Sequence, residues 1–489
     1  MKVYASKEIK EWDRFSIEEE GIQSFQLMQR AAASCFRWIQ RKYTRESEID
    51  ILCGPGNNGG DGLLVAAYLF QRGYTIACYA IEGGASIDRQ LALDYAEKQG
   101  LKLYPLSDYS GKKEHLLIDA LFGHGMTRPL QGEFARLVKG INELNATVIS
   151  IDIPSGMPSE AQNEFFPLFI RAKHIVSFQQ PKQSFFLDEY GSTIASWELL
   201  DIGLSQAFSA DAPVLLDERE TRSRFIEKPR FSHKGTFGST LLIGGALHYP
   251  GAISLFTLGA LASGVGKTFV ACPDNASETC KTLAPEAIYL PNCGQDILSL
   301  APNLSPYDSV GIGPGLGMDK QTEDLVLNLF SQSNRWVIDA DALNILAKHP
   351  DVLPKGEVLI TPHPGEFDRL THTHSTTGAR WKTAQILSKD KGWVVVLKGA
   401  YTSIFFPDGR QFINSSGNAG LAKGGSGDVL CGLITGLLAR GYSVEDGALI
   451  AVYLHGLAAD RLSLTQSKDG IKAQELIPAI ETISKQWEN

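Results

Sequence analysis

A glycine-rich segment near the end of the chain constrains its fold most strongly. Gly424, Gly425 and Gly427 precede Asp428, and residues 429–438 then form an apolar run with helical spacing. Glycines let consecutive backbone N–H groups converge, and a helix start adds its positive dipole end, so the segment predicts an anion site. Asp428 follows where it can take a proton from a hydroxyl beside that anion, which favours phosphoryl transfer with Asp428 as base. A plain helix N-cap is the alternative for Asp428.

Three further motifs precede this segment. Residues 423–428 (KGGSGD) resemble the signature of the ribokinase-like fold. Taken with residues 233–238 (HKGTFG), 361–366 (TPHPGE) and 394–399 (VVVLKG), they are similar to the ADP-dependent NAD(P)H-hydrate dehydratase family. The resemblance covers about residues 221–489. It implies repair of the hydrated, redox-inactive forms of NADH and NADPH.

The same resemblance implies the site residues of this half. Asp428 is expected to be the catalytic residue. The implied contacts are Ala252, Gly315, His363 and Asp428 for the hydrated substrate; Lys398, Gly399, Ala400, Tyr401, Thr402 and Gly427 for ADP; and Gly425, Ser426 and Gly427 for an anion hole. A solvated lysine at a strand end is the alternative for Lys398.

Two patterns in this half suggest metals. Asp339 and Asp341 follow a predicted strand and are candidates for a Mg²⁺ site that works through phosphates, with turn capping as the alternative. His363, His372 and His374 invite a zinc interpretation, but no Glu or Cys completes a known ligand spacing.

The first half alternates predicted strands and helices. Residues 48–53 read as a strand, residues 54–62 (GPGNNGGDG) as a glycine-rich turn, and residues 63–70 as an apolar helix. Further strands are expected at 74–80, 114–120 and 147–152, with helices at 88–100 and 131–144 between them. This spacing predicts a parallel sheet whose ligands bind at the carboxyl ends of its strands. Asp119, Asp152 and Ser155 fall at such ends, although each alone could cap a turn.

This half, over about residues 5–208, resembles the NAD(P)H-hydrate epimerase family, which has a Rossmann-like fold. Residues 54–62, 119–123 (DALFG) and 152–156 (DIPSG) carry the resemblance. It implies Asp152 as the acid/base residue. The other implied residues are substrate contacts at Asn57, Asn58, Gly59, Gly60, Asp61, Gly123, His124, Gly125, Met126, Thr127, Arg128, Pro129 and Asp152, and K⁺ ligands at Asn58, Asp119 and Ser155. Oxygen ligands of low charge suit a hard, weakly held cation better than zinc.

Composition limits the classes of partner that the protein is expected to bind and the compartment in which it is expected to work. A net charge of −9 and a pI near 5.7 argue against nucleic acid, and no apolar run approaches the ~20 residues of a membrane span. The first residues show no secretion signal, and the seven cysteines show no Cys-x-x-Cys pair, so we expect reduced thiols and a cytoplasmic protein. We also expect a homo-oligomer, of a size that the sequence does not give.

We therefore predict an α/β protein with an N-terminal Rossmann-like three-layer sandwich (1–210) and a C-terminal ribokinase-like α/β domain (221–489). The first domain is expected to interconvert the R and S epimers of hydrated NADH and NADPH (NADHX and NADPHX). The second is expected to dehydrate the S form at the expense of ADP, with Mg²⁺ and K⁺ as cofactors, giving NAD(P)H, AMP and phosphate.

Departures from the epimerase pattern leave alternatives open. Gln29 stands where the family commonly has Glu, His124 replaces a small or hydroxyl residue, and residues 157–166 also differ, so the epimerase could be impaired. A small-molecule kinase of the same fold, and a non-catalytic binding role for the first half, are the rival interpretations. The sequence does not decide between NADHX and NADPHX, between ADP and ATP, or whether substrate is channelled.

Overall fold

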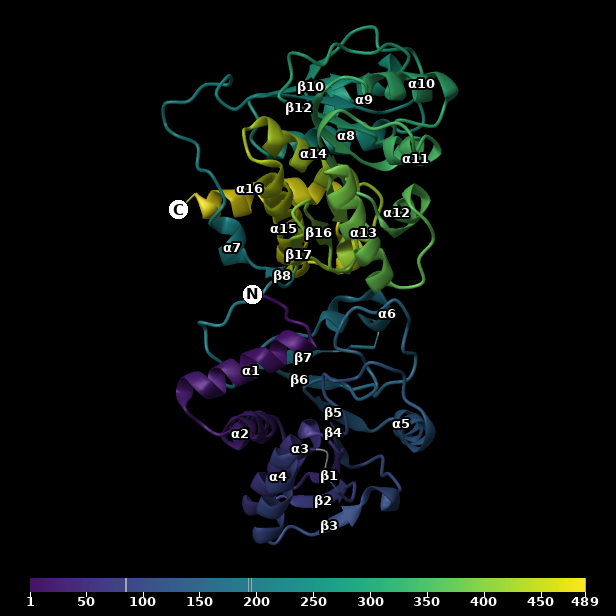
Figure 1. Cartoon of the computed structure of the whole chain (residues 1–489). Coiled ribbons are helices and arrows are strands. Elements are labelled where there is room, and N and C mark those ends of the chain that lie inside the picture. The colour runs from purple at the N-terminus through teal and green to yellow at the C-terminus, as the bar shows by residue number, and fades with distance from the viewer. Residues whose placement is uncertain (84–85, 192, 195, 489) are drawn as a thin grey trace. The chain divides into compact units, whose positions relative to one another are not determined.

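The computed structural model of the chain describes residues 1–83, 86–191, 193–194 and 196–488 (Figure 1). Asn489, the expected end of the second domain, lies outside these residues. The chain divides into two compact units. The first contains Lys2–Pro213 and Ser375–Ala379; the second contains Met1, Val214–His374 and the chain from Arg380 onward.

The first unit is built on a parallel sheet. Within the described residues the sheet has seven strands in the order β3-β2-β1-β4-β5-β6-β7, and every neighbouring pair is parallel. The strands are β1 Glu48–Cys53, β2 Thr75–Ala80, β3 Leu103–Pro105, β4 Leu116–Ala120, β5 Thr147–Ile151, β6 His174–Phe178 and β7 Trp197–Leu200. The helices are α1 Ser6–Glu20, α2 Ser24–Lys42, α3 Asn57–Gln71, α4 Ile87–Lys98, α5 Gly132–Leu144 and α6 Asp188–Gly191, with 3-10 turns at Leu106–Asp108 and Gln183–Phe186. The strand order reverses between β1 and β4, which is where an open α/β sheet forms its ligand crevice.

Helix α3 begins earlier than the glycine pattern predicted. The sequence placed a turn at residues 54–62, but the helix starts at Asn57 and includes Gly59, Gly60 and Gly62. A Cβ on Gly59 would lie 2.0 Å from the carbonyl oxygen of Gly54, and one on Gly62 would lie 2.6 Å from the Ala120 Cβ. These glycines therefore let the helix start pack directly on the strand ends.

The second unit has a mixed sheet. Its order is β11-β10-β9-β12-β13-β14-β15-β16-β17-β8 among the described strands; β16 runs antiparallel to β15 and β17, and the other pairs are parallel. The strands are β8 Val214–Leu216, β9 Ser239–Ile243, β10 Lys267–Ala271, β11 Ile288–Tyr289, β12 Ser309–Ile312, β13 Asn334–Ile338, β14 Gly356–Ile360, β15 Val394–Leu397, β16 Ser403–Phe405 and β17 Gln411–Asn414.

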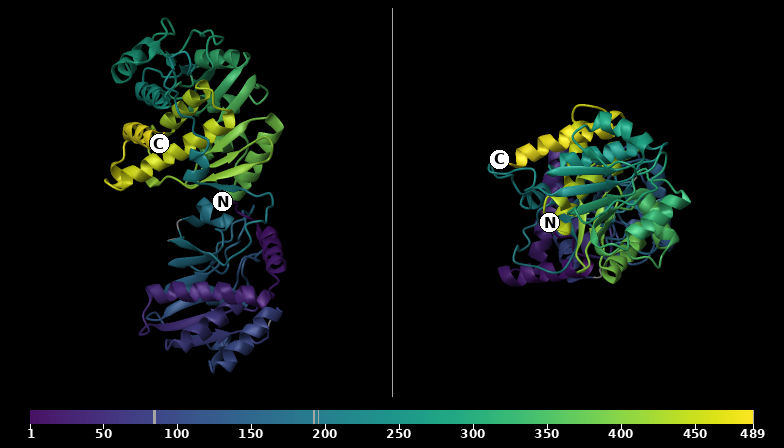
Figure 2. Two further views of the ribbon diagram at one scale, coloured as in Figure 1. Left: turned by 90° about the vertical axis from the view of Figure 1, so that its left-hand side faces the viewer. Right: turned by 90° about the horizontal axis from the view of Figure 1, so that it is seen from above.

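The helices of this unit lie around the sheet, and in the left view of Figure 2 the yellow helices α14, α15 and α16 lie on one side of the strands. The helices are α7 Glu218–Arg222, α8 Pro250–Ala262, α9 Asp274–Leu283, α10 Lys320–Leu329, α11 Ala340–Lys348, α12 Pro364–Leu370, α13 Thr377–Lys391, α14 Ser426–Ala439, α15 Val444–Ser463 and α16 Leu476–Trp487. The 3-10 turns are Ala419–Leu421, Lys468–Gly470 and Ala473–Glu475. None of the described helices combines the length and apolar character that a bilayer span requires.

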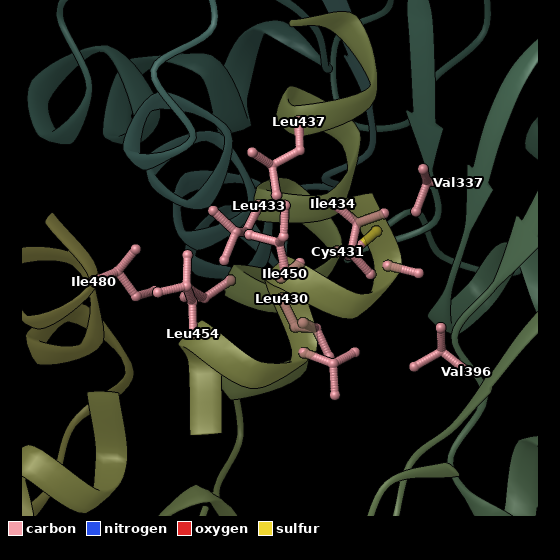
Figure 3. Close-up of a cluster of buried hydrophobic side chains, with 14 of the residues drawn as sticks. Val337, Val396, Leu430, Cys431, Leu433, Ile434, Leu437, Ile450, Leu454 and Ile480 are labelled. Atoms are coloured by element: carbon pink, nitrogen blue, oxygen red, sulfur yellow. The ribbon is translucent and has the colours of Figure 1, made fainter. Parts of the chain in front are cut away.

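Helix α14 runs through the core of the second unit. Its side chains Leu430, Leu433 and Ile434 are buried among residues of the sheet and of α15 (Figure 3). Glycines bring α14 against α8: a Cβ on Gly259 would lie 2.2 Å from the carbonyl oxygen of Val429, and one on Gly432 would lie 2.0 Å from that of Phe256. The position of the α14 start is therefore fixed by backbone contact as well as by apolar burial.

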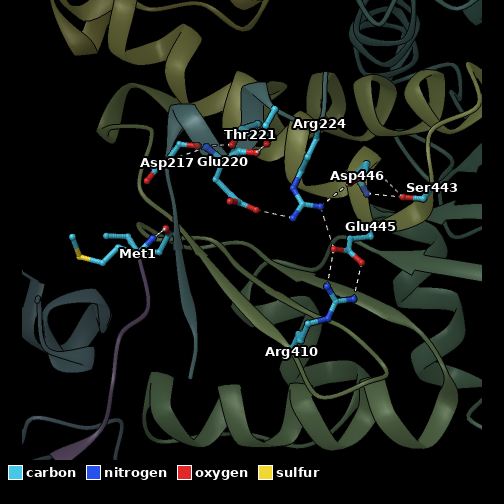
Figure 4. A network of polar contacts seen from close by, with 11 residues as sticks. Met1, Asp217, Glu220, Thr221, Arg224, Arg410, Ser443, Glu445 and Asp446 are labelled. Atoms are coloured by element: carbon cyan, nitrogen blue, oxygen red, sulfur yellow. Dashed lines mark hydrogen bonds and ion pairs between the residues drawn. The ribbon is translucent and has the colours of Figure 1, made fainter. Parts of the chain in front are cut away.

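An ion-pair network ties the beginning of the second unit to α15. The Arg224 guanidinium lies 2.7 Å from an Asp446 carboxylate oxygen and 3.2 Å from one of Glu445, and Arg410 lies 2.7 Å from Glu445 (Figure 4). Nearby, the backbone of Met1 pairs with that of Leu215 in β8. The segment after β8 is thereby held on the helix layer.

Candidate functional sites

The first unit contains a cavity of about 460 Å³ at the carboxyl ends of its central strands. It brings together most of the predicted residues of this half. Those that line it are Asn57, Asn58, Asp61, Gly123, His124, Gly125, Met126 and Asp152. Gly59 and Gly60 are buried in the first turn of α3. In the described structure the cavity lining does not include Thr127, Arg128 or Pro129, which continue the same loop.

Asp152 is held as an anion in this cavity. It follows β5 with a left-handed backbone (φ 66°) and is 5% exposed. One carboxylate oxygen lies 2.7 Å from the Lys182 ammonium, and the other lies 3.5 Å from His124 Nδ1. Burial alone would raise the pKa of Asp152, but Lys182 and His124 outweigh it and hold that pKa well below its usual range. Asp152 is therefore ionised at neutral pH and holds a proton poorly.

Sequence reasoning missed four charged residues that line this cavity, Lys10, Asp13, Asp88 and Lys182. Lys182 is only 2% exposed and follows β6 within the segment Phe178-Gln-Gln-Pro-Lys182. Its neighbours Gln180 and Gln183 are polar, so the local sequence does not signal its burial, although a buried lysine needs an anionic partner. Asp13 lies on α1, far from any glycine motif, and nothing in its local sequence singles it out.

The three predicted K⁺ ligands, Asn58, Asp119 and Ser155, are all buried. Asp119, at the end of β4, accepts hydrogen bonds from Ser150 Oγ (2.7 Å), Leu121 N (3.2 Å), and both Ser155 N (2.9 Å) and Ser155 Oγ (2.5 Å). Asn58 differs, because its buried amide oxygen and nitrogen have no hydrogen-bond partner among the described residues. A buried amide without partners indicates an unmet ligand, and Asn58 is where one would bind.

The second unit contains a larger cavity of about 830 Å³ around the start of α14. It gathers the predicted nucleotide, anion and catalytic residues in one place. Those that line it are His363, Lys398, Gly399, Ala400, Tyr401, Thr402, Gly425, Ser426, Gly427 and Asp428. Asp339, Glu366 and His455 line it as well, and the last two were not singled out as site residues from the sequence.

The start of α14 presents a backbone anion site with a carboxyl beside it. Gly425 is the N-cap with φ 94°, and the helix begins at Ser426, so the N-cap alternative for Asp428 is wrong. The first N–H groups of a helix have no intrahelical acceptor and remain available for an anion. Burial, followed by the charge of Asp339, raises the pKa of Asp428 to about 7. That value suits a general base at neutral pH.

Lys398 is held by carboxylates rather than left in solvent. Its ammonium lies 2.9 Å from Asp339 and 3.9 Å from Glu366. Burial would lower the pKa of Lys398, but these two carboxylates outweigh it and raise that pKa. Lys398 therefore stays positively charged at the wall of the cavity, where it can face a phosphate.

The two residues proposed for Mg²⁺ behave differently. Asp341 accepts the backbone N–H of Gly317 at 2.8 Å, which is the turn-capping alternative, whereas Asp339 pairs with Lys398. No group of three His, Cys, Asp or Glu side chains among the described residues is placed to hold a metal by itself. A magnesium ion here would need the phosphates of the nucleotide as further ligands.

The histidines of this unit have separate roles. His363 is the N-cap of α12, and its Nδ1 accepts the N–H of Gly365 at 3.0 Å. His374 is buried, with Nδ1 2.8 Å from Asp368 and Nε2 2.8 Å from Thr383.

His455 supports the start of α14. Its Nε2 donates to the carbonyl oxygen of Ser426 at 2.9 Å, since a carbonyl only accepts. Burial lowers the pKa of His455 to about 4, so the ring is neutral at pH 7. This contact helps to fix the helix start that carries Asp428, and no motif around His455 predicts it.

Two predicted substrate residues lie outside this cavity lining in the described structure. Ala252, on α8, and Gly315 are neighbours, because a Cβ on Gly315 (φ 63°) would lie 2.9 Å from the Ala252 Cβ. The loop that contains Gly315 is held at Gly317, whose N–H donates to the Asp341 carboxylate at the start of α11.

Two family models match the chain. Residues 240–482 match the model described as NAD(P)H-hydrate dehydratase, and residues 24–184 match the one described as YjeF-related protein N-terminus. Both cavities fall largely within these matches.

Proteins similar over the full length carry one description. A bifunctional NAD(P)H-hydrate repair enzyme of Moorella thermoacetica is 33% identical over 520 aligned positions, which cover 100% of this chain and 97% of the relative. A protein of the same description from Thermofilum pendens is 31% identical, covering 98% of this chain and 95% of the relative.

Solved structures match the second unit. The ADP/ATP-dependent NAD(P)H-hydrate dehydratase of Bacillus subtilis, co-crystallised with ATP and Mg²⁺, is 33% identical with a TM-score of 0.51, covering 56% of this chain and 99% of that one. A ribokinase-like superfamily protein of Enterococcus faecalis is 28% identical with a TM-score of 0.51, covering 58% of this chain and 99% of that one.

Proposed function

The chain belongs to the family of bifunctional NAD(P)H-hydrate repair enzymes, and we propose that it returns hydrated NADH and NADPH to their active forms by epimerisation followed by nucleotide-dependent dehydration. The first unit interconverts the R and S hydrates. The second dehydrates the S form with ADP as phosphoryl donor, yielding NAD(P)H, AMP and phosphate. Membership of this family argues against both rival interpretations, a small-molecule kinase and a non-catalytic first half.

One observation carries the dehydration mechanism: Asp428, with a pKa of about 7, lies in the first turn of α14 in the cavity that Lys398 also lines. Asp428 takes the proton of the hydrate's hydroxyl, whose oxygen attacks the β-phosphorus of ADP. The bond from that phosphorus to the bridging oxygen breaks, and AMP leaves. The backbone N–H groups of residues 425–427 bind the oxygens of the migrating phosphoryl group.

The second step needs little from the protein. The ring nitrogen's lone pair expels phosphate from the carbon that bore the hydroxyl, and loss of a proton from the adjacent carbon restores the dihydropyridine. Phosphate is a far better leaving group than hydroxide, which is why the nucleotide is consumed.

Charge in the second cavity fits Mg²⁺ held through phosphates. Burial, and after it the charges of Asp339 and Glu366, raise the pKa of Asp428, and these three carboxyl groups line the cavity with Lys398. Bound Mg²⁺ would compensate the phosphate charge. Asp339 and Glu366 are the residues that would face it, and Lys398 neutralises the remaining phosphate oxygens.

The direct test of the whole reaction is optical. Purified protein is incubated with hydrated NADH, once with ADP and once with ATP, and absorbance at the reduced-nicotinamide band is followed. We expect NADH to appear with stoichiometric AMP and phosphate when ADP is supplied. A stable phosphorylated product, or no nucleotide dependence, would overturn the proposal.

For the first unit we infer that Asp152 is the base. Its low pKa keeps it ionised at neutral pH, so it can take a proton from the water that re-enters on either face of the hydrated carbon. His124, the unusual residue of this loop, lies 3.5 Å from Asp152 and so takes part in the same charge cluster. This geometry supports an active epimerase despite the departures at Gln29, His124 and residues 157–166.

Of the three predicted K⁺ ligands of the first unit, Asn58 is the one best placed to bind the cation. The unpartnered Asn58 amide oxygen supplies one ligand, and Ser155 Oγ, which donates to Asp119 and accepts from Phe122 N, has a lone pair left. Asp119 already accepts four hydrogen bonds, so direct ligation would require the Ser155 hydroxyl proton to turn away. Bound K⁺ would supply positive charge for an anionic substrate group.

We also propose a cytoplasmic homo-oligomer. The described cysteines are all free and buried, which suits a reducing compartment. Size-exclusion chromatography with light scattering measures the assembly state directly.

A further inference from the structure

Asp13 lines the first cavity, and its carboxyl group makes no contact that stabilises the fold among the described residues. It lies on α1 and lines the cavity with Asp152, Lys182 and His124, which come from other parts of the chain. Among the residues that the structure describes, no hydrogen-bond donor or ion-pair partner engages its carboxylate. A partly buried carboxylate that stabilises nothing nearby is placed for a ligand rather than for the fold.

Two of the carboxyl groups that line this cavity, those of Asp13 and Asp152, have opposite proton affinities. Burial and the negative charge of Asp152 raise the pKa of Asp13 to about 6, although His124 and Lys182 oppose the rise. The pKa of Asp152 is shifted the other way by Lys182 and His124. Asp13 can therefore hold a proton near neutral pH at the same time as Asp152 is ionised. Environments that push two neighbouring pKa values apart are how one site holds an acid and a base together.

Epimerisation needs both groups. The hydroxyl must leave as water, which takes a proton from an acid, and returning water must lose a proton to a base. Lys182 is committed to Asp152 by its 2.7 Å ion pair. Asp152 holds a proton poorly, so the acid has to come from another side chain of the cavity.

We propose that Asp13 is a second catalytic residue of the first cavity, the general acid that protonates the departing hydroxyl. The inference rests on the proposed epimerase function. The carbon–oxygen bond breaks with its electron pair on oxygen, the Asp13 proton completes a water molecule, and the ring nitrogen's lone pair forms a carbon–nitrogen double bond. When water adds to either face, Asp152 takes one of its protons, and proton exchange through the enclosed water restores the acid form of Asp13.

The test measures epimerisation alone. The full-length protein is incubated with R hydrate in the absence of nucleotide, so that the second unit is silent, and the epimers are separated by chromatography from pH 5 to 9. The spontaneous rate at each pH is subtracted. We expect the wild-type rate to be highest below pH 6 and to fall about tenfold per pH unit above it, because the acid form of Asp13 is being lost.

Asp13→Asn should lower the rate by about 10²- to 10⁴-fold. It should also abolish the fall in rate above pH 6, which is the descending limb of the pH profile. Asp13→Glu keeps an acid and should retain the limb at a reduced rate. Glu18→Gln, a neutralised carboxylate on the exposed face of the same helix, is the matched control and should behave as wild type. The titratable and charged groups that face Asp13 are His124, Asp152, Lys182 and Asp61, with Lys10 and Asp88 also lining the cavity. His124→Gln should therefore keep the limb if Asp13 is its source.

Each outcome is decisive. If Asp13→Asn keeps both the wild-type rate and the limb, the inference is wrong, while the proposed function stands. If the wild-type protein itself does not exceed the spontaneous rate, the proposed epimerase function fails. ADP-dependent dehydration of S hydrate by each variant reports on whether the second unit is intact, and a thermal melt reports on the first. If Asp13→Asn does not fold, the pH dependence of Asp13→Glu and of His124→Gln is used instead. Whether the rate of each variant still falls above pH 6 shows which residue causes the fall.

Discussion

At the scale of single residues, neighbouring charges shift the pKa values of Asp428 and Asp152 in opposite directions. Asp428 is partly buried near Asp339 and Asp341, and its pKa rises to about 7. Asp152 is buried against Lys182 and His124, and its pKa falls. Burial acts in the same direction on both carboxyls, so the sign of the nearest charge decides the outcome.

The raised pKa of Asp428 predicts the pH dependence of dehydration. A base must be ionised to act, so the wild-type rate with S hydrate and ADP should rise as pH increases through about 7 and then level off. Asp428→Asn should lower the rate by about 10²- to 10⁴-fold at every pH. Stopped-flow absorbance measures both, and calorimetry should find ADP binding preserved. A variant with a near-normal rate would end the proposed mechanism.

Removing Lys182 should destabilise the first unit. Lys182→Met removes the closest cation of the buried Asp152 carboxylate, and we expect a loss of about 3–5 kcal/mol in the free energy of unfolding at pH 7. Much of it should return in the double variant Lys182→Met/Asp152→Asn, in which no charge is stranded. Urea unfolding of the four proteins measures the coupling.

The pH dependence of that coupling has a definite sign. The folded-state pKa of Asp152 is depressed, so the ion pair contributes fully above the unfolded-state pKa of about 4 and is lost as pH falls further. An equal loss of stability in the single and double variants would show that Lys182 acts through packing alone.

Asn58 should make the stability of the first unit depend on K⁺. A ligand that binds only the folded state raises stability in proportion to the logarithm of its concentration. The melting temperature of the wild-type protein should therefore be higher in KCl than in tetramethylammonium chloride at equal ionic strength. In Asn58→Leu the difference should vanish, because the unpartnered amide oxygen is gone. A difference that persists in this variant would place the cation elsewhere.

At the scale of elements, both sites depend on helices whose first turns touch other backbone. Gly259 in α8 faces Val429 in α14, directly after Asp428. Gly251 lies in the same helix α8, but a Cβ there would meet nothing within 4 Å. The two glycines thus offer the same substitution in one helix with opposite surroundings.

Gly259→Ala should cost about 1–3 kcal/mol of unfolding free energy and slow dehydration, because a Cβ 2.2 Å from the Val429 carbonyl oxygen must push α14 aside. Gly251→Ala should be neutral or stabilising by up to about 1 kcal/mol, since alanine is the better helix former. Thermal melts and steady-state rates compare the pair. Equal effects of the two substitutions would show that α14 is not positioned by this contact.

The elements themselves were largely predictable from sequence. The alternation of apolar runs with helical segments placed β1 at Glu48–Cys53 as observed, and each Gly-rich motif correctly indicated a helix close by. The start of α3 was misplaced because glycine signals a turn locally, whereas Gly59 and Gly62 are required for tertiary packing. The backbone propensity of a residue describes its own conformation. It does not describe the element that packs against that residue in the fold.

The partners that tune each site were not predictable in the same way. Lys182, Asp13 and His455 come from elements distant in sequence from the residues they affect. Each is an ordinary residue in its own segment, and only the strand order brings it to the cavity. Motifs therefore located the reacting groups, while the pKa shifts that prepare these groups emerged only from the fold.

At the scale of the whole molecule, the two activities are complementary in their chemistry. A dehydratase that accepts one epimer leaves the other behind, and an epimerase restores the supply. Among the described residues, the first cavity is lined only from residues 9–204 and the second only from residues 339–456. Each unit therefore carries a complete cavity of its own, and the hydrated nucleotide can pass between them through solution.

This separation predicts complementation between two inactive proteins. Asp152→Ala alone should dehydrate the S fraction of an epimer mixture and then stall, apart from slow spontaneous epimerisation, and Asp428→Asn alone should produce no significant NADH. An equimolar mixture of the two variants with ADP should consume both epimers, because each supplies the cavity that the other lacks. Absorbance at the reduced-nicotinamide band follows the reaction, and wild-type protein at the same site concentration is the control. A mixture that stalls at the S fraction would mean that the hydrate must be handed over within one molecule.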